Sequence, residues 1–241
     1  MKLIVLKRKK LIYTAIAMVI AGSLLIAASA VHGTLNASAG TAGGGKSFKT
    51  DKKQVAITVE TELGEDRTAK MLEVLKKHGA KATFCVMGLW AQDHTEELEQ
   101  IVKGGYEVIS HTMYHGHYAE MTDEEIKEDM ESADALLKVL AGIETRYVRL
   151  PYRDSDADDE RVTGTVYSSG RIPVGYSLDM AGECVGKNAE KTAKAMLKKT
   201  VPGSIVNFGM ETDIAAEVLE AYLFGLETRG YETLLISETN L

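Results

Sequence analysis

The chain of 241 residues is 45% hydrophobic and 26% charged, with 22 glycines and only 3 prolines, which excludes a collagen-like or wholly disordered protein. Its formal net charge is −7, and because every charge in residues 1–45 is basic, the remainder is more acidic still. An acidic body is repelled by phosphate backbones, so the sequence predicts no nucleic-acid partner. Two cysteines, Cys85 and Cys184, are too few for a disulfide-built scaffold, and the sequence leaves open whether they pair.

The N-terminus carries a predicted membrane segment. Residues 11–31 form an uncharged run that follows a basic cluster. A helix of about 20 apolar residues spans a bilayer, and basic flanks stay on the cytoplasmic side. Residues 1–31 are therefore predicted to be a cytoplasmic stub and a transmembrane helix. Small residues around Ala30 also resemble a cleavage site, so two outcomes stay open: a membrane-anchored protein with an extracytoplasmic domain, or a secreted one cleaved near Ala30.

A stretch rich in Gly, Ala and Ser follows the apolar segment. Residues 32–53 show no apolar periodicity, which is typical of a flexible linker. The folded domain is then predicted over residues 54–241.

Within this domain, predicted strands and helices alternate. Runs of β-branched and apolar residues predict seven strands, at 55–59, 81–86, 106–110, 146–150, 172–178, 204–208 and 231–236. Amphipathic patterns with caps or glycine stops predict six helices, at 67–79, 96–103, 122–140, 156–169, 188–199 and 213–228.

Strict alternation predicts the α/β class with a parallel sheet, because parallel strands need crossover connections. A (β/α) barrel of about seven parallel strands and an open doubly wound sheet both satisfy this pattern. The first strand–helix junction has no GxGxxG, and the chain has no P-loop, so nucleotide binding is unsupported.

Ionisable and hydrogen-bonding residues gather where the predicted strands end, which is where chemistry lies in parallel α/β proteins. These residues are Glu60, His111, His115, His117, Arg149, Tyr152 and Asp179. The HxxxH spacing of His111 and His115 can point two imidazoles at one metal ion, for which Zn²⁺, Ni²⁺ and Co²⁺ are suitable, although a solvated loop satisfies the same spacing.

Seven short segments together resemble one known family, the polysaccharide deacetylases with the NodB-homology domain, carbohydrate esterase family four. In order, they are AITVE (56–60), GAKATF (79–84), VISHTMYH (108–115), VRLPY (148–152), YSLD (176–179), PGSI (202–205) and GYETL (230–234). The resemblance implies a distorted (β/α) barrel. Residues 60–66 are most similar to a divergent, sporulation-associated branch, in which membrane-anchored ectodomains occur.

The resemblance also implies an activity. Family members remove acetyl groups from N-acetylglucosamine units with a divalent metal held by one Asp and two His, so the implied partner is peptidoglycan or a chitin-like glycan and the implied cofactor is Zn, or else Co or Ni. By position, His111 and His115 match the metal-binding histidines. Arg149 matches the arginine that orients the base, Tyr152 the oxyanion-side tyrosine, and Asp179 the aspartate behind the general acid.

Four positions depart from the family pattern. Glu60 stands where the general-base Asp stands, and Thr61 replaces the metal-binding Asp. Gly209 replaces the general-acid His, and Arg153 replaces a Gly. Because alternate strand residues share a face, Glu60 or Glu62 is available as a third metal ligand, and Glu62 is preferred because Glu60 is needed as the base.

Two hypotheses follow. The first is a metal-dependent deacetylase of an envelope glycan, with Glu60, Arg149, Tyr152 and Asp179 at the catalytic positions. The second is a catalytically degenerate relative that binds glycan, or helps to assemble the cell or spore envelope, and it is motivated by Thr61 and Gly209.

Overall fold

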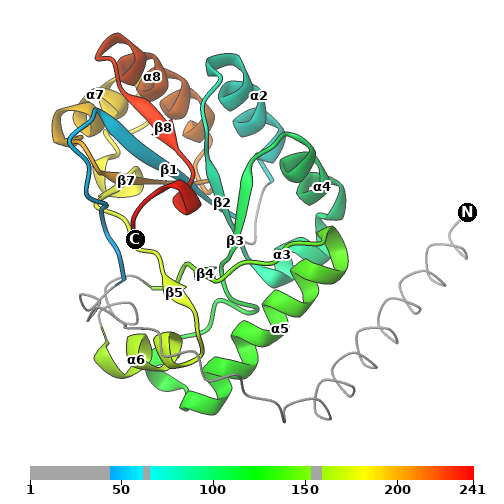
Figure 1. Ribbon diagram of the computed structural model, residues 1–241. Helices are drawn as coiled ribbons and strands as arrows, with labels where there is room; N and C mark the ends of the chain where they lie inside the picture. Colours follow the sequence, from blue (N-terminus) through cyan, green and yellow to red (C-terminus); the bar gives the residue numbers. More distant parts are fainter. Residues whose placement is uncertain (1–43, 62–65, 153–158) are drawn as a thin grey trace, which may run out of the picture. The chain divides into compact units, whose positions relative to one another are not determined.

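A computed structural model describes residues 44–61, 66–152 and 159–241 (Figure 1). The predicted membrane segment at 11–31 lies outside these ranges, as do Glu62 and Arg153. Within them, no helix combines the length and apolar character that crossing a bilayer requires.

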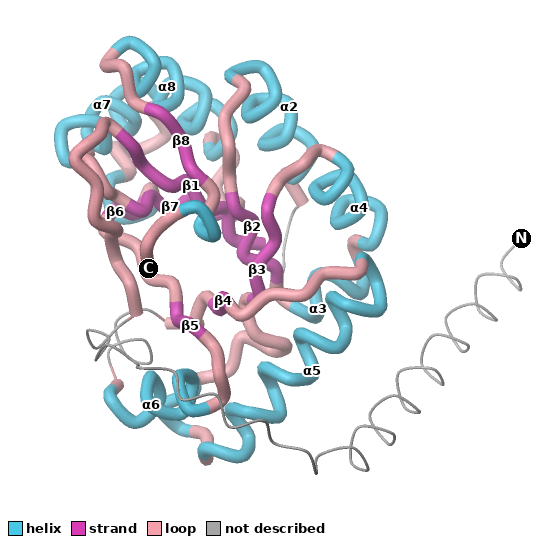
Figure 2. The backbone as a smooth tube through the Cα atoms, viewed as in Figure 1, coloured by secondary structure: helices cyan, strands magenta, loops and turns pink. Residues whose placement is uncertain are grey.

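The described residues form one sheet of eight parallel strands, which curves into a distorted half-barrel (Figure 2). The strands are β1 (Gln54–Thr61), β2 (Thr83–Val86), β3 (Glu107–Ser110), β4 (Tyr147–Val148), β5 (Ile172–Pro173), β6 (Leu178–Asp179), β7 (Ile205–Gly209) and β8 (Glu232–Leu234). Their order is β5-β4-β3-β2-β1-β7-β6, and β8 pairs with β1 beside this path. The predicted α/β class with a parallel sheet is confirmed.

One predicted strand is wrong in extent: residues 172–178 form two strands, not one. β5 pairs with β4, whereas β6 pairs with β7 at the other end of the sheet. Between them, the amide of Val174 bonds to the carbonyl of Val148, and the amide of Ser177 bonds to the carbonyl of Ile205. The chain therefore changes its partner strand within one extended segment, and the sheet has eight strands where seven were predicted. A run of apolar residues in the sequence does not reveal such a change.

Helices lie around the outside of the curved sheet (Figures 1 and 2). They are α2 (Thr68–His78), α3 (Gly88–Asp93), α4 (Thr95–Lys103), α5 (Asp123–Ala141), α6 (Glu160–Ser168), α7 (Ala189–Lys199) and α8 (Ala215–Thr228). The α3 helix was not predicted, because its six residues are too few to show a helical period. The start of α5 follows from a capping box, in which Thr122 and Glu125 bond to each other's backbone amides.

The side chains of β1 alternate between two environments, as the pleat of a strand requires. Val55, Ile57 and Val59 are fully buried in the larger core, which contains residues of α2, α7 and α8. Ala56 belongs to a second apolar cluster, together with residues of β2, β3 and β7. Glu60 falls in the same alternating set as Ala56, so the pleat directs its carboxylate to the inner side of the sheet.

Residues 44–53, at the end of the predicted linker, contact the sheet. Gly45 bridges to Val174 and Ser47 to Ser204. Phe48 is 7% exposed and belongs to the inner apolar cluster. The backbone of Phe48 approaches Gly203 so closely that a Cβ on Gly203 would lie 2.0 Å from the Phe48 carbonyl oxygen. Contacts with the domain therefore begin before Gln54.

The two cysteines are both free thiols, with Cys85 buried and Cys184 exposed. Burial, opposed in part by the positive charge of Arg149, raises the pKa of Cys85 to about 12. Cys85 is thus a packed, protonated residue of β2 and not a nucleophile.

Candidate functional site

Arg149 is the centre of a buried polar cluster at the carboxyl ends of the strands. The residue follows β4 and is 2% exposed. Its Nη1 atom forms an ion pair with Glu60 and donates to Asn207 Oδ1 at 2.9 Å. Its Nε atom donates to the Val174 carbonyl at 2.6 Å, and Nη2 donates to Thr58 Oγ1 at 3.2 Å. One guanidinium therefore joins β1, β4, the β5–β6 segment and β7.

Glu60 is held as a carboxylate by two donors. Oε1 pairs with Arg149, and Oε2 accepts from Asn207 Nδ2 at 3.0 Å. Burial pushes the pKa of Glu60 up, but the charge of Arg149, the proximity of His111 and the two hydrogen bonds together hold this pKa below its ordinary value. Glu60 is consequently ionised at neutral pH.

Asn207 of β7 is a functional residue that the sequence analysis missed. It is 2% exposed, and its Nδ2 lies within hydrogen-bond distance of both Glu60 Oε2 and Asp179 Oδ1, the latter at 3.3 Å. Its Oδ1 accepts from Arg149 and from Thr58 Oγ1 at 3.0 Å. A signal was present: Asn207 interrupts an otherwise apolar predicted strand, and a buried amide needs partners.

His111, at the end of β3, presents a neutral imidazole. The ring is 1% exposed, and Nδ1 lies 3.0 Å from the Arg149 carbonyl oxygen, which is an acceptor, so Nδ1 carries the proton. Burial, only partly offset by Glu60, lowers the pKa of His111 to about 4. Nε2 is buried without a hydrogen-bond partner among the described residues. Its lone pair is available to a ligand, because neutral imidazole is the metal-binding form.

His115 lies beside His111, as predicted. The two ring centroids are 4.8 Å apart, with an interplanar angle of 86°. His115 and Thr112 both have left-handed backbone angles, with φ of 53° and 63°. Such angles are unfavourable for residues with a Cβ and are concentrated at functional sites. The conformation that brings the two imidazoles together therefore has an unfavourable backbone energy at Thr112 and His115.

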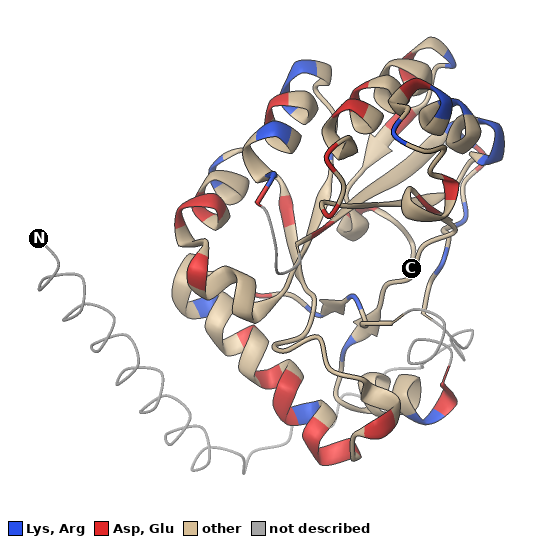
Figure 3. Ribbon diagram, turned by 180° about the vertical axis from the view of Figure 1, so that it is seen from behind, with Lys and Arg blue, Asp and Glu red and all other residues tan. Residues whose placement is uncertain are grey.

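Asp129 of α5 fixes this histidine loop. Its carboxylate accepts from the amides of Met113 at 3.0 Å and Tyr114 at 3.2 Å, and from the Tyr118 hydroxyl at 2.6 Å. The sequence did not indicate this role, because Asp129 is one of many acids in α5, whose acidic bands are visible in Figure 3. Only its burial distinguishes it from them, since it is 5% exposed.

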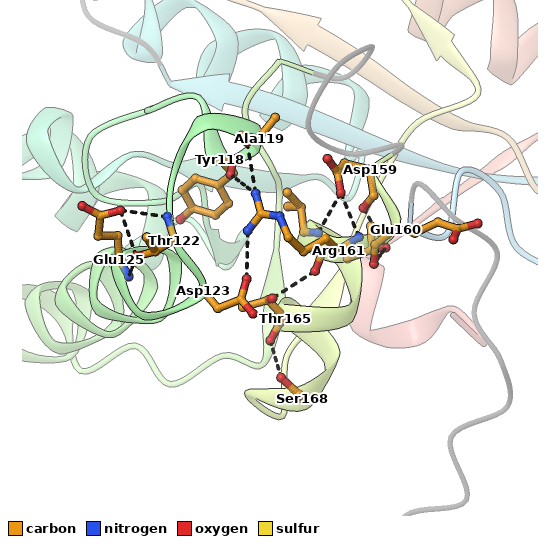
Figure 4. A network of polar contacts seen from close by, with 12 residues as sticks. Tyr118, Ala119, Thr122, Asp123, Glu125, Asp159, Glu160, Arg161, Thr165 and Ser168 are labelled. Carbon is orange, nitrogen blue, oxygen red and sulfur yellow. Dashed lines mark hydrogen bonds and ion pairs between the residues drawn. The ribbon is translucent and has the colours of Figure 1, made fainter.

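A second set of contacts holds the far end of the same loop (Figure 4). Arg161 of α6 donates to the carbonyls of Tyr118 and Ala119 at 3.0 and 3.1 Å, and it pairs with Asp123 at 2.8 Å. The loop is thus clamped between the start of α5 and the start of α6.

Tyr152 closes one side of the site. Its ring centroid lies 4.8 Å from that of His115 and 3.6 Å from that of His117, on which it stacks with an interplanar angle of 14°. Tyr152 also has a left-handed backbone, with φ of 46°, and its side chain is partly exposed. An aromatic surface of this kind is accessible to a ligand.

The Thr61 hydroxyl connects two neighbouring strands. Its hydroxyl donates to the Cys85 carbonyl at 3.4 Å and accepts from the Met87 amide at 3.1 Å, which ties β1 to the end of β2. Among the described residues, no three His, Cys, Asp or Glu side chains are placed to hold a metal ion. His111 and His115 therefore fit two positions of a metal site, and the third predicted ligand, Glu62, lies outside the described residues.

Comparisons with known proteins agree with the motifs. A family model for polysaccharide deacetylase matches residues 47–164. A peptidoglycan-N-acetylglucosamine deacetylase from Bacillus cereus is 26% identical over 184 residues, which cover 75% of this chain and 66% of that protein. An uncharacterized 30.6 kDa protein from Geobacillus stearothermophilus is 33% identical over 183 residues, which cover 75% of this chain and 68% of that protein.

Solved structures share the fold. A wild-type pseudoenzyme of carbohydrate esterase family four from Bacillus anthracis matches with a TM-score of 0.70 at 22% identity, over 78% of this chain and 66% of that one. The chain spans 60%, 66% and 68% of the lengths of three curated relatives that it matches.

Proposed function

The chain belongs to the polysaccharide deacetylase family, and from this premise we propose that its strand-end site hydrolyses N-acetyl groups on peptidoglycan or a related N-acetylglucosamine glycan of the cell envelope. The observation that carries the proposal is the Glu60 carboxyl group, held by Arg149 and Asn207, in the same cluster as His111 Nε2, which has no hydrogen-bond partner among the described residues.

In this reaction a water oxygen attacks the carbonyl carbon of the acetamide, and Glu60 accepts the proton that the water loses. Arg149 and Asn207 fix both carboxylate oxygens, so the base is held in one orientation. Tyr152 borders the substrate on the side of the developing oxyanion, and Asp179 lies behind the place of the leaving amine. Collapse of the tetrahedral intermediate releases acetate and a free amine.

The metal belongs to the same proposal. His111 and His115 supply two imidazoles, and Glu62 is the proposed third ligand for Zn, or else for Co or Ni. A divalent ion held there would polarise the amide carbonyl. The buried Nε2 of His111, which has no described hydrogen-bond partner, supports this assignment.

We further propose that the domain works outside the cytoplasm, anchored by residues 11–31 or secreted after cleavage near Ala30, in the envelope of a cell or spore. The uncharged segment after a basic cluster supports this location, because such a segment directs the chain that follows it across the membrane. An envelope glycan lies on that outer side.

Acetate release tests the function. The purified chain, with and without added Zn²⁺ or Co²⁺, is expected to release acetate from peptidoglycan or from chitin oligomers. Glu60→Gln removes the base and is expected to lower the rate about 10²- to 10⁴-fold. His111→Ala is expected to lower the metal content, whereas His78→Ala, at the end of α2, leaves it unchanged. Absence of release with either metal contradicts the proposal.

The second candidate function is glycan binding without hydrolysis. It is favoured by Thr61, which has no carboxylate and whose hydroxyl is committed to the β1–β2 connection. This function predicts that binding to peptidoglycan survives chelation and survives His111→Ala. A glycan sedimentation assay measures it, and loss of binding in both experiments excludes it.

A further inference from the structure

Glu211 occupies the space beside Gly209, the position where the resemblance places a general-acid histidine. A Cβ added to Gly209 would lie 1.9 Å from Glu211 Oε2 and 2.6 Å from Glu211 Cδ. A side chain at residue 209 and the present position of the Glu211 carboxyl group exclude each other. Glycine at the end of β7 is therefore what allows the carboxyl group of Glu211 to lie against this strand.

Arg67, which precedes α2, contacts the chain on both sides of Glu211, through the Met210 backbone and the Asp213 side chain. Arg67 Nη1 donates to the Met210 carbonyl at 2.7 Å, and Nη2 donates to Asp213 Oδ1 at 2.8 Å. Met210 is buried, whereas Glu211 is exposed. Glu211 is thus an exposed residue on a held turn, with its carboxyl group packed against Gly209.

The charges facing Glu211 come from several elements. Burial against the protein raises the pKa of Glu211, and the negative charges of Glu60 on β1 and Asp179 on β6 raise it further. The backbone amide of Glu211 and the positive charge of Arg67 oppose this rise, but the net pKa lies above the ordinary value. Nearby Lys187 is paired with Asp213 at 3.5 Å. A carboxyl group in this setting retains its proton at a higher pH than a free glutamic acid does.

We propose that Glu211 is the proton donor of this site, in the place of the missing histidine. The inference rests on the proposed deacetylase function. When the carbon–nitrogen bond of the tetrahedral intermediate breaks, the electron pair goes to nitrogen, and the Glu211 carboxyl proton is transferred to that nitrogen. The amine leaves, acetic acid is formed and loses its proton to solvent as acetate, and the Glu211 carboxylate regains a proton from solvent. The proton taken from water by Glu60 returns to solvent, so the step balances without another reactant.

The test compares three variants of the full chain in acetate release from chitin oligomers across pH. Glu211→Gln has nearly the same shape but cannot donate this proton, and we expect kcat to fall about 10²- to 10⁴-fold with little change in KM. Glu211→Asp retains an acid on a shorter side chain, and we expect it to keep part of the rate. Both the wild type and Glu211→Asp are expected to lose activity as pH rises through the pKa of the donor. Glu217→Gln, on the exposed first turn of α8, is the matched control and is expected to leave the rate unchanged.

The outcomes separate the two proposals. If the wild type releases acetate and Glu211→Gln matches it at every pH, the assignment of Glu211 is overturned while the deacetylase function stands. Equal losses in Glu211→Gln and Glu211→Asp without a change in the alkaline limb also overturn it, because they indicate a structural role. If the wild type releases no acetate, the deacetylase function itself fails and the inference fails with it.

Discussion

At the residue scale, the site depends on a few buried polar side chains that satisfy one another. Glu60 and Thr58 of β1, Asn207 of β7 and Arg149, which follows β4, bond directly. A buried charge is tolerated only when it is paired and hydrogen-bonded. Each side chain of the cluster therefore depends on the others, since the loss of one leaves its partners buried without a hydrogen bond or a counter-charge.

Arg149→Met tests this dependence. The substitution leaves Glu60 buried without its cation, and we expect the free energy of unfolding to fall by about 3–5 kcal/mol. Urea unfolding monitored by circular dichroism measures the change. Arg146→Met is the control, because Arg146 is an exposed neighbour in sequence, and its effect is expected within about 0.5 kcal/mol. Equal effects of the two substitutions would show that the cluster adds no stability.

At the element scale, the histidine loop between β3 and α5 is positioned by contacts from the neighbouring helices in addition to its own hydrogen bond from the His115 amide to Thr112 Oγ1. Asp129 of α5 holds the loop's amides, and Arg161 of α6 holds its far end. The left-handed angles at Thr112 and His115 persist because these contacts outweigh their local cost. Loop geometry at the site is thus a property of the α5–α6 pair.

Asp129→Ala is the corresponding prediction. Three donors lose their acceptor, so we expect a loss of about 1–3 kcal/mol in the free energy of unfolding. Hydrogen exchange is expected to become faster at the amides of Met113 and Tyr114, and metal retention is expected to fall as the imidazoles separate. Glu128→Ala, the exposed neighbour in α5, is the control. Unchanged exchange at both amides would contradict this role of Asp129.

At the scale of the whole molecule, segments distant in sequence complete the half-barrel. The 44–48 segment bonds to the chain near both β5 and β7, and Phe48 fills the inner side of the sheet. Phe48 adds apolar contacts at the side of the sheet where hydrogen bonding between strands is short, because β4, β5 and β6 have two residues each.

Phe48→Ala is expected to lower the free energy of unfolding by about 3–5 kcal/mol, since it removes a buried aromatic ring and leaves a cavity. Thermal and urea unfolding of the full chain measure the effect. Phe224→Ala is the matched control, because that ring is 66% exposed on α8. A loss no larger than that of the control would mean that residues 44–48 do not contribute to the stability of the domain.

The sequence by itself determined the α/β class, most of the strands and helices, and the set of strand-end residues, because apolar periodicity, capping and glycine stops are local signals. It also predicted that His111 and His115 lie together, since their spacing in one loop allows it, and the ring centroids are 4.8 Å apart. It did not reveal Asn207, Asp129 or Glu211, because residues of these types are common in any sequence. Asn207 and Asp129 are distinguished only by their burial, and Glu211 only by its position beside Gly209.

Tertiary structure alone decided the division of residues 172–178 into β5 and β6, because the choice of strand partner depends on segments far away in the chain. It also decided that the Thr61 hydroxyl serves the β1–β2 connection and that a carboxyl group lies beside Gly209. Both are facts of three-dimensional proximity, and proximity between distant residues is fixed only when the whole chain packs.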